Sequence, residues 1–382
     1  MKKLALFLAL LLLPLSLFTG CGKEEDTQKN PLFQGGLAAI TLDGKVGYLN
    51  AEGTLVIPAT FEAAEPFTED GLAAVKKEGK YGYINKSGSF VIPASFESAD
   101  TFSPVGLALV KKDGKYGYID KSGKLVIAPA FSLASSFDAG GYAAAAKDKK
   151  FGYIGKDGNF VIPPQFDYAF DFTEDDLALV MVNGRYGYID REGHYVINPT
   201  FDLATDFASC GLALVKSGGR YTYIDREGEY LLRPTYPTAS PFSFGLAAVE
   251  TAEGEWGYLN EEGELAIPSQ FSYAASFSSC GLALVKLGNA YGYINEEGDY
   301  VINPIYDEAT DFSPEGNALV KTDGKWGMIN QKGELILPAA YDLYQSASVV
   351  YDDGYVFLSD SENIYLFDAK GREIFRHALA AK

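Results

Sequence analysis

The residues in this sequence that are best suited to catalysis are carboxylates that recur in pairs. Two aspartates stand four residues apart in "FDYAFDF", "FDLATDF" and "YDEATDF", and these pairs are Asp167 and Asp171, Asp202 and Asp206, and Asp307 and Asp311. Paired carboxylates can hydrolyse glycosidic bonds, and carboxylate oxygens also bind calcium. An active site is normally unique in a chain, whereas these pairs recur, so we expect them to cap backbone amides in turns. Weak calcium binding and glycoside hydrolysis are the alternatives.

Histidine chemistry has two candidates, His194 and His377, and neither lies in a recognisable motif. His194 follows the glycine of the turn "REGHYV", where similar segments carry Thr54 or Lys124, so we interpret it as an exposed turn residue. The sequence contains no phosphate-binding loop and no "HExxH" motif. It therefore predicts no catalytic residue, no metal site and no cofactor.

Aromatic side chains offer a different chemistry, because rings can stack on sugars and the chain has 26 tyrosines and 25 phenylalanines. Most of these rings recur at fixed positions, which is typical of a buried core. Three tyrosines that share one position are the candidates for a surface aromatic platform: Tyr195, Tyr230 and Tyr300. Because Leu55 and Leu125 occupy the same position elsewhere, we expect these rings to be mostly buried, with at most the hydroxyl in water.

All of these residues belong to a repeat of 35 residues. A glycine follows an aromatic or apolar residue at regular intervals, with one exception: Gly47, Gly82, Gly117, Gly152, Gly187, Thr222, Gly257, Gly292 and Gly327. A second glycine, such as Gly88 or Gly123, keeps the same period. Fixed periods between about 20 and 50 residues are typical of solenoids, propellers and arrays.

One unit reads as three strands, for example "GLALVKK", "KYGYID" and "KLVI", joined by the turns "KDGK" and "KSGK". A proline follows the third segment, and because it lacks an amide hydrogen we expect the strand to end there. The next dozen or so residues are interpreted as a connection. The first strand points Leu107 and Leu109 to one face and Ala108 and Val110 to the other, so both faces are apolar.

A small sheet with two apolar faces must lie between two neighbours, so we expect the units to stack sheet on sheet. Glycines such as Gly117 are expected to leave room for an aromatic ring of the neighbouring sheet. The predicted fold is all-β, with about ten tandem three-stranded antiparallel meanders stacked face to face. We favour a propeller-like ring, and an open β-solenoid or superhelix is the alternative.

The amino-terminal segment is predicted to direct export. Lys2 and Lys3 precede an apolar run and then small residues, which is the pattern of a secretory signal. The sequence "FTGC" resembles the end of a bacterial lipoprotein signal, which implies that Cys21 carries the lipid that holds the protein in the bilayer. The predicted organisation is a lipoprotein signal peptide (1–20), a polar tether (21–31), nine repeats (32–345) and a degenerate tenth repeat or cap (346–382).

The remaining cysteines and the charge limit the classes of partner. Cys210 and Cys280 occupy the same repeat position two units apart, so sheet spacing separates them by roughly 20 Å, too far for a disulfide. We therefore expect two free, largely buried thiols. The chain has 51 acidic and 32 basic residues, a formal net charge of −19, which repels nucleic acid as a partner.

The whole pattern resembles the WG-repeat family, whose units are named for a Trp-Gly pair. The pair is intact at Trp256-Gly257 and Trp326-Gly327, and in most other units tyrosine replaces the tryptophan. At Thr222 the glycine itself is lost, which puts the close packing of that unit in doubt.

The resemblance implies an interaction scaffold without a common substrate. We therefore expect a non-catalytic repeat scaffold on a membrane-anchored lipoprotein, facing outside the cytoplasm, that binds a protein partner in the cell envelope. A carbohydrate-binding or peptidoglycan-binding module is the alternative, and a glycoside hydrolase is a further one.

Overall fold

The computed structural model describes residues 31–233, 235–343 and 350–379. Apart from the short 3-10 helix η2 (Gln34–Gly36), the regular elements of these residues are β-strands. The strands form antiparallel sheets that follow one another along the chain, and we number them 1 to 10. Within the described ranges, no helix has the length and apolarity that a membrane span requires.

Sheets 1 to 5 contain, in chain order, β1 (Ala38–Leu42), β2 (Lys45–Leu49) and β3 (Leu55–Phe61); β4 (Ala63–Ala64), β5 (Leu72–Lys77), β6 (Lys80–Asn85) and β7 (Phe90–Phe96); β8 (Ser98–Phe102), β9 (Ala108–Lys112), β10 (Lys115–Ile119) and β11 (Leu125–Phe131); β12 (Leu133–Ala134), β13 (Ala143–Lys147), β14 (Lys150–Ile154) and β15 (Phe160–Phe166); and β16 (Tyr168–Phe172), β17 (Ala178–Val182), β18 (Arg185–Ile189) and β19 (Tyr195–Phe201).

Sheets 6 to 10 contain β20 (Leu203–Phe207), β21 (Ala213–Ser217) and β22 (Arg220–Ile224); β23 (Thr238–Ala239), β24 (Ala247–Glu250), β25 (Trp256–Leu259) and β26 (Leu265–Phe271); β27 (Tyr273–Ala274), β28 (Ala283–Leu287), β29 (Ala290–Ile294) and β30 (Tyr300–Tyr306); β31 (Glu308–Ala309), β32 (Asn317–Thr322), β33 (Lys325–Asn330) and β34 (Leu335–Leu343); and β35 (Val356–Ser359), β36 (Asn363–Phe367) and β37 (Glu373–Ala378). The end of β34 also pairs with β35, which joins sheets 9 and 10.

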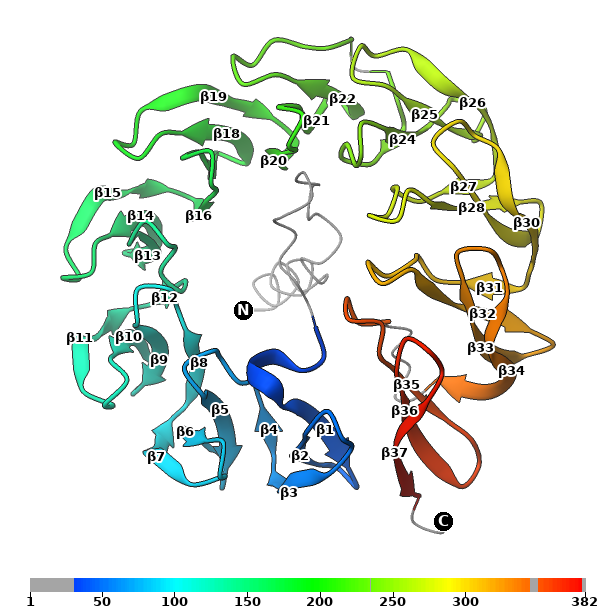
Figure 1. The fold of residues 1–382 in the computed structure, drawn as a ribbon. Coiled ribbons are helices and arrows are strands. Elements are labelled where there is room, and N and C mark those ends of the chain that lie inside the picture. Colours follow the sequence, from blue (N-terminus) through cyan, green and yellow to red (C-terminus); the bar gives the residue numbers. More distant parts are fainter. Residues whose placement is uncertain (1–30, 234, 344–349, 380–382) are drawn as a thin grey trace, which may run out of the picture.

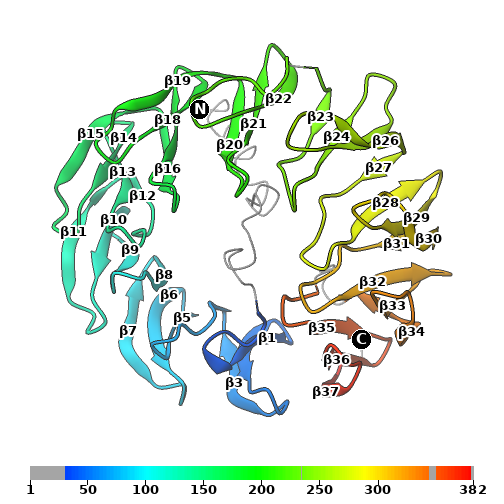
Figure 2. The ribbon, with the colours of Figure 1, turned by 45° about the horizontal axis from the view of Figure 1, so that its top comes forward.

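The sheets follow one another around a central space, with short strands such as β8, β16 and β20 on the inner side and long strands such as β11, β15 and β19 on the outer side (Figures 1 and 2). Each sheet is buried on both faces, as predicted. Leu109 and Tyr118 of sheet 3 pack against Ile154 of sheet 4, while Ile119 of sheet 3 packs against Tyr83 of sheet 2.

The first and last sheets also share a core. Ile40 and Leu49 of sheet 1 are buried together with Ile364 and Leu366 of sheet 10. The segment before β1 reinforces this contact, because the backbone amide of Leu32 donates a hydrogen bond of 3.1 Å to Asp353 Oδ1. Further along the same boundary, His377 Nε2 lies 3.5 Å from Asp43 Oδ2. The two ends of the described chain therefore meet.

The prediction of three-stranded meanders is wrong for sheets 2 to 5 and 7 to 9, which have a fourth, innermost strand. This strand lies in the segment interpreted as a connection. In sheet 3 it is β8, whose Ala99 pairs with Val110 of β9. Only Ala99 and Phe102 of this strand are buried, and polar residues such as Asp100 face the open centre. The short strand therefore lacks the apolar alternation that revealed the other three.

The expectation that proline ends the third strand is also wrong. In β7, Pro93 lies at the centre of the strand, which is the free edge of its sheet. The pairs Tyr81–Phe96 and Tyr83–Ile92 enclose one residue of β6 but three of β7, so the edge strand bulges around the proline. Proline is tolerated at a bulge on an edge strand because no ladder hydrogen bond is lost there.

This bulge also explains the first glycine of the repeat. A β-carbon at Gly82 would lie 2.6 Å from the Ile92 carbonyl oxygen and 2.6 Å from the Ala94 nitrogen, both in the edge strand of the same sheet. The expectation that this glycine makes room for a ring of the neighbouring sheet is therefore wrong. The second glycine touches the neighbour instead. A β-carbon at Gly88, whose φ is +78°, would lie 3.1 Å from Ile57 of the preceding sheet.

In sheets 1 to 8 a tyrosine of the middle strand donates a hydrogen bond to the innermost segment that follows it in the chain. Tyr83 is fully buried, and its hydroxyl donates a hydrogen bond of 2.7 Å to the Asp100 carbonyl oxygen, 17 residues later. Desolvation by burial raises the pKa of this hydroxyl far above its usual range, so it remains a donor. The tyrosines with the same hydrogen bond are Tyr48, Tyr83, Tyr118, Tyr153, Tyr188, Tyr223, Tyr258 and Tyr293.

Candidate functional site

Carboxylates on the inner side of the sheets, towards the central space, form the most distinctive group of side chains in the described residues. They stand in or just after the innermost strands, whose alternate residues enter the core, so the polar residues between them face solvent. We call them the inner carboxylates, and they are Glu65, Asp100, Asp171, Asp206 and Asp311. They come from sheets 2, 3, 5, 6 and 9.

The inner carboxylates are harder to ionise than ordinary acids, although each keeps contact with solvent. Desolvation by the surrounding sheets raises the pKa of Asp206 to about 6, with the charges of Asp171 and Asp175 adding to the effect. Desolvation also raises the pKa of Asp311 to about 6. The pKa of Glu65 is raised by desolvation and then by the charge of Asp100. A cation placed among these groups would remove part of this electrostatic cost.

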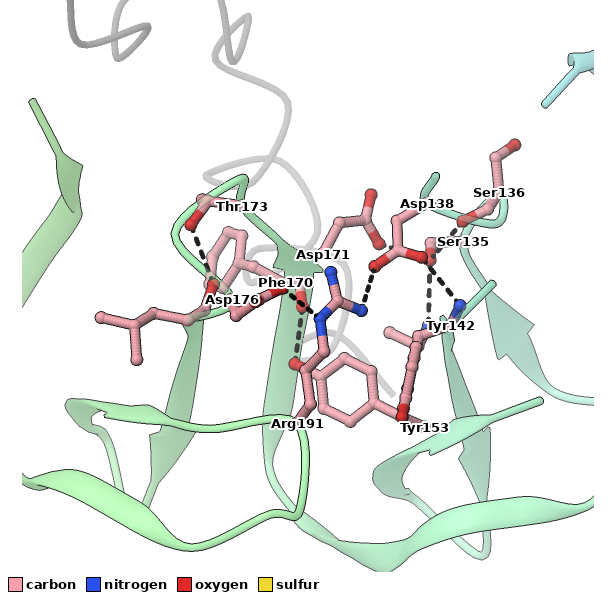
Figure 3. Close-up of polar contacts among 12 residues, drawn as sticks. Ser135, Ser136, Asp138, Tyr142, Tyr153, Phe170, Asp171, Thr173, Asp176 and Arg191 are labelled. Carbon is pink, nitrogen blue, oxygen red and sulfur yellow. Dashed lines mark hydrogen bonds and ion pairs between the residues drawn. The ribbon is translucent and has the colours of Figure 1, made fainter. Parts of the chain in front are cut away.

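Between sheets 4 and 5 the chain supplies such a cation itself (Figure 3). Arg191 lies 3.1 Å from Asp138 Oδ2 of sheet 4 and 2.5 Å from Asp176 Oδ1 of sheet 5. Its guanidinium also lies 4.9 Å from the centre of the Tyr142 ring and 4.8 Å from that of Phe172. We call these five residues the Arg191 cluster. Charge pairing and cation–π contact together fix the guanidinium in place.

The inner carboxylate beside this cluster has a hydrogen-bond donor. The Ser135 hydroxyl donates to Asp171 Oδ1 over 2.6 Å (Figure 3). This bond partly offsets the rise in pKa that desolvation causes at Asp171. Asp100 has a weaker counterpart, a hydrogen bond of 3.4 Å from the Ser136 hydroxyl.

The aspartate pairs of the sequence analysis are divided between two environments. The first member caps a hairpin, as expected. Asp167 Oδ2 accepts a hydrogen bond of 2.5 Å from the Asn183 amide, and Oδ1 accepts one of 2.6 Å from Lys150 Nζ. The second member, Asp171, is instead an inner carboxylate with different partners. The structure therefore does not bring the two acids together as a catalytic pair.

The predicted aromatic platform lies on the outer strands. Tyr195, Tyr230 and Tyr300 have exposed fractions of 42%, 46% and 37%, so they are more exposed than expected. Each ring lies edge-on to a phenylalanine of the preceding sheet, as for Tyr195 and Phe166 at 6.3 Å between ring centres. The three tyrosines come from sheets 5, 6 and 8 and do not touch one another.

His194 is an exposed turn residue, as predicted, with 78% of its side chain accessible. Asp190, Glu192 and His194 are the one group among the described residues whose potential metal-ligating atoms lie within 4.8 Å of one another. Asp190 Oδ1 already accepts hydrogen bonds from the amides of Glu192 and His194, so the turn itself explains the arrangement.

The cysteines divide between described and undescribed parts of the chain. Cys21 and the predicted signal peptide lie outside the described residues. Among the described residues Cys210 and Cys280 form no disulfide, as predicted, and both are half-buried, so they are less enclosed than expected. Cys280 Sγ lies 3.0 Å from the Ser278 hydroxyl.

Sequence reasoning missed the inner carboxylates as a group. Their signal was present but irregular, because Glu65 and Asp100 occupy one repeat position whereas Asp171, Asp206 and Asp311 occupy the next one. Arg191 gave no signal of its own, since Lys121 and Lys156 hold the same position in other units. Reading the connection as the innermost strand would have placed all of these acids at the inner edge of the sheets.

Several solved structures share the general arrangement of the strands at low sequence identity. A crystal structure of the eukaryotic initiation factor is 13% identical, and the match covers 80% of this chain and 95% of that chain with a TM-score of 0.51. BamB from Moraxella catarrhalis is 16% identical, with coverages of 82% and 94% and a TM-score of 0.38. These likenesses concern the fold alone. No curated protein matches the chain.

The repeat itself identifies the family. The model of the WG containing repeat matches nine consecutive segments: 47–81, 81–116, 116–151, 151–186, 186–221, 221–252, 256–289, 291–326 and 326–346. These segments start or end near the aromatic-glycine pair and include the buried tyrosine and the edge-strand bulge described above. The chain therefore belongs to the WG containing repeat family.

Proposed function

We propose that the protein is a non-catalytic scaffold, anchored through Cys21 on the outer side of a membrane, that binds a protein partner in the cell envelope. The inner side of the ring is the binding surface. The partner presents a segment rich in lysine and arginine, because the surface that receives it carries carboxylates from five sheets.

One observation carries this proposal, namely that desolvation by the sheets, aided at some positions by neighbouring acids, disfavours ionisation of the inner carboxylates. Asp206 is raised to a pKa of about 6 by desolvation and by neighbouring acids. Such an arrangement costs folding free energy at neutral pH and is typical of a functional surface rather than a structural one. A cationic partner would recover that free energy on binding.

The test measures the affinity of the purified full chain for a lysine-rich peptide and for a glutamate-rich peptide of the same length. We expect only the first to bind. Replacing Asp100, Asp171 and Asp206 with asparagine should weaken binding at least about tenfold, or about 1.4 kcal/mol.

The matched control changes the same amount of charge elsewhere. Glu227, Glu262 and Glu297 are exposed turn residues, so their replacement with glutamine should leave the affinity within about twofold. Equal loss in both triple variants would show a response to net charge only and would contradict a specific surface on the inner side.

A second candidate function is binding of carbohydrate or peptidoglycan, and it rests on the half-exposed rings of Tyr195, Tyr230 and Tyr300. Sedimentation of the full chain with purified peptidoglycan tests it. Binding that persists in the triple asparagine variant and is lost when the three tyrosines become alanine would favour this candidate over protein binding.

Anchoring through Cys21 is tested by cell fractionation. The Cys21→Ala variant should appear in the soluble fraction or accumulate unprocessed, because the lipid-bearing residue is absent. A variant of normal size that stays with the membrane would contradict the lipoprotein proposal.

We also propose that the ten sheets form a closed, propeller-like ring in solution. The core shared by Ile40, Leu49, Ile364 and Leu366 supports closure between the first and last sheets. Small-angle scattering distinguishes the alternatives, because an open stack of ten sheets would approach about 100 Å in length at about 10 Å per sheet. A scattering profile of that length would contradict the ring.

A further inference from the structure

Two sites on the inner side of the ring occupy the same position in the repeat but carry different side chains. The first lies between sheets 4 and 5 and holds the Arg191 cluster, and the second lies between sheets 8 and 9, four repeats or 140 residues later. Phe172 and Asp171 of the first place correspond to Phe312 and Asp311 of the second. The ring and the inner carboxylate are thus present in both places.

The second place lacks the chain's own cation and the two acids that hold it. Gln331 stands where Arg191 does, Ser278 replaces Asp138, and Gly316 replaces Asp176. These three changes remove one positive and two negative charges together, so the charged groups that pair with one another in the first place are all absent. Asp311 is the charged group of this set that remains.

Asp311 also lacks the donor that serves its counterpart. Ser135 donates to Asp171, but Ala275 occupies the position that corresponds to Ser135 and has no hydroxyl. Among the described residues no side chain or backbone amide donates to the Asp311 carboxylate, and desolvation is the one cause of its altered ionisation. The Asp311 carboxylate therefore has no hydrogen-bond donor among the described residues.

A cavity opens beside this carboxylate. Its volume is about 410 Å³, and Asp311 lines it together with Tyr273, Thr310, Phe312, Ser313 and Asp352. In sheet 5 the position of Thr310 is occupied by Phe170, whose ring lies 4.8 Å from that of Tyr168 and 6.5 Å from that of Tyr186. Phe170 packs towards sheet 6, whereas the smaller Thr310 lines the cavity.

We propose that the cavity beside Asp311 binds one lysine or arginine side chain of a partner protein, with the cationic group against the Asp311 carboxylate and the aliphatic stem between the rings of Tyr273 and Phe312. The Arg191 cluster is the precedent within the same molecule, because it holds a guanidinium with carboxylates and aromatic rings at an equivalent place. At Asp311 the partner supplies the cation, whereas in the Arg191 cluster the chain itself supplies it. This inference rests on the protein-binding function proposed above and names its central contact.

A lysine or arginine side chain fits the cavity better than a metal ion does. Phe312, Leu284, Ala309 and Pro314 give the lining an apolar part, which suits an aliphatic stem. A small divalent cation would need six or more oxygen ligands and would leave these groups in contact with water.

The experiment uses the purified full chain and three small probes: N-acetyl-lysinamide, N-acetyl-argininamide and the neutral N-acetyl-norleucinamide. Binding is followed by calorimetry or by chemical shifts of the chain. We expect at least one cationic probe to bind about tenfold or more tightly than the norleucine probe, because only a cation can pair with Asp311.

Three variants locate the binding. Asp311→Asn should weaken binding of the cationic probe at least about tenfold, and Thr310→Phe should do the same by filling the cavity. Glu227→Gln is the control, because Glu227 is an exposed turn residue outside the inner carboxylates, and it should change the affinity by less than about twofold. Thermal unfolding of each variant establishes that it is folded, and Thr310→Phe keeps the charge of the site if Asp311→Asn proves unstable.

The proposal is overturned if the norleucine probe binds as well as the cationic probes, or if Asp311→Asn and Thr310→Phe, both folded, bind as the unchanged chain does. Equal loss in Glu227→Gln also overturns it, since the probe would then respond to net charge alone. Failure of the probes, while the lysine-rich peptide still binds, would refute this cavity and leave the protein-binding function intact. Failure of that peptide as well would refute both.

Discussion

Sheets 5 and 6 carry nearly the same edge segment, "YVINPTF" in one and "YLLRPTY" in the other, but they pair it differently. In sheet 5 the segment is the strand β19, and Tyr188 pairs with Ile197 at its centre. In sheet 6 the bridges Tyr221–Tyr236 and Ile224–Tyr230 are kept at the two ends, and the strand between them is lost.

One difference between the two sheets lies in the middle strand. Sheet 5 has Gly187, where a β-carbon would lie 2.6 Å from the Ile197 carbonyl oxygen, and sheet 6 has Thr222. The Thr222 hydroxyl donates a hydrogen bond of 2.6 Å to the Leu232 carbonyl oxygen, and the Leu231 amide bonds to the Tyr223 carbonyl oxygen. The repeat therefore tolerates loss of the edge strand as long as the freed backbone groups find other partners.

The largest effect is expected when sheet 5 is given the residue of sheet 6. Gly187→Thr introduces a side chain where no space exists, so the edge strand must shift or detach. We expect a loss of about 3 kcal/mol in the free energy of unfolding, measured by urea denaturation, and lost hydrogen-exchange protection in β19. Unchanged stability would show that the edge segment adapts at no cost.

A smaller effect, equal in the two sheets, is expected from the buried tyrosine. Tyr188→Phe and Tyr223→Phe each remove a hydroxyl that donates to a backbone carbonyl, over 2.6 Å and 2.7 Å. Each change should cost about 1.5 kcal/mol in the free energy of unfolding. The control is Tyr195→Phe on the half-exposed outer strand, expected to cost less than about 0.5 kcal/mol. A clear difference between the two buried positions would show that the missing strand loosens the core of sheet 6.

Giving sheet 6 the glycine of sheet 5 is expected to weaken it. Thr222→Gly removes the hydrogen bond to Leu232 and adds backbone freedom, so the loss should be about 1 kcal/mol. Thermal unfolding measures the change, and Thr222→Ser, which keeps the hydroxyl, is the control. If glycine stabilises the chain and new exchange protection appears at Leu232, the edge strand has formed, and the threonine alone prevents it.

The smallest effect compares the inner carboxylates of the two sheets. The pKa of Asp206 in the folded chain is about 6, above its unfolded value of about 4, so the folded state holds the proton more firmly. The contribution of Asp206 to the free energy of unfolding is fully present below a pH of about 4 and is lost as the pH rises to about 6. Asp206→Asn should therefore stabilise the chain at pH 7, by less than about 1 kcal/mol because solvent screens the exposed carboxylate.

The same change should bring no gain at pH 4, where Asp206 is largely protonated in the folded chain. Asp171→Asn is the counterpart in sheet 5, and it should stabilise less at pH 7 because it disturbs the hydrogen bond from Ser135. Denaturation curves of the two variants and the unchanged chain at pH 7 and pH 4 measure the four changes in the free energy of unfolding. A stabilisation by Asp206→Asn that is independent of pH would contradict the raised pKa.

The features that the sequence predicted correctly are those that every unit repeats. The period, the hairpins, the two apolar faces and the aromatic core all follow from residues such as Tyr118 and Ile119, which recur in nearly unchanged surroundings. The loss at Thr222 was also correctly identified as a packing irregularity. Nearest-neighbour contacts leave a strong pattern because each of them is copied several times.

The features that the sequence did not predict depend on the register between neighbouring strands and on residues that face the central space. The role of Gly82 required knowing that β7 bulges opposite it, which no local pattern indicates. The strand β8 was missed because Asp100 faces an open space rather than a half-exposed surface. The cavity at Asp311 depends on differences between two repeats, so a search for what the repeats share could not find it.

The core between sheets 1 and 10 can form only after the last part of the chain has been synthesised. Sheet 1 is complete once Phe61 has left the ribosome, but Ile364 and Leu366, which cover one of its faces, come about 300 residues later. At about 5–20 residues per second this interval lasts roughly 15 to 60 seconds. During that time Ile40 and Leu49 remain uncovered, so the first sheet is the part of the nascent chain most in need of a chaperone.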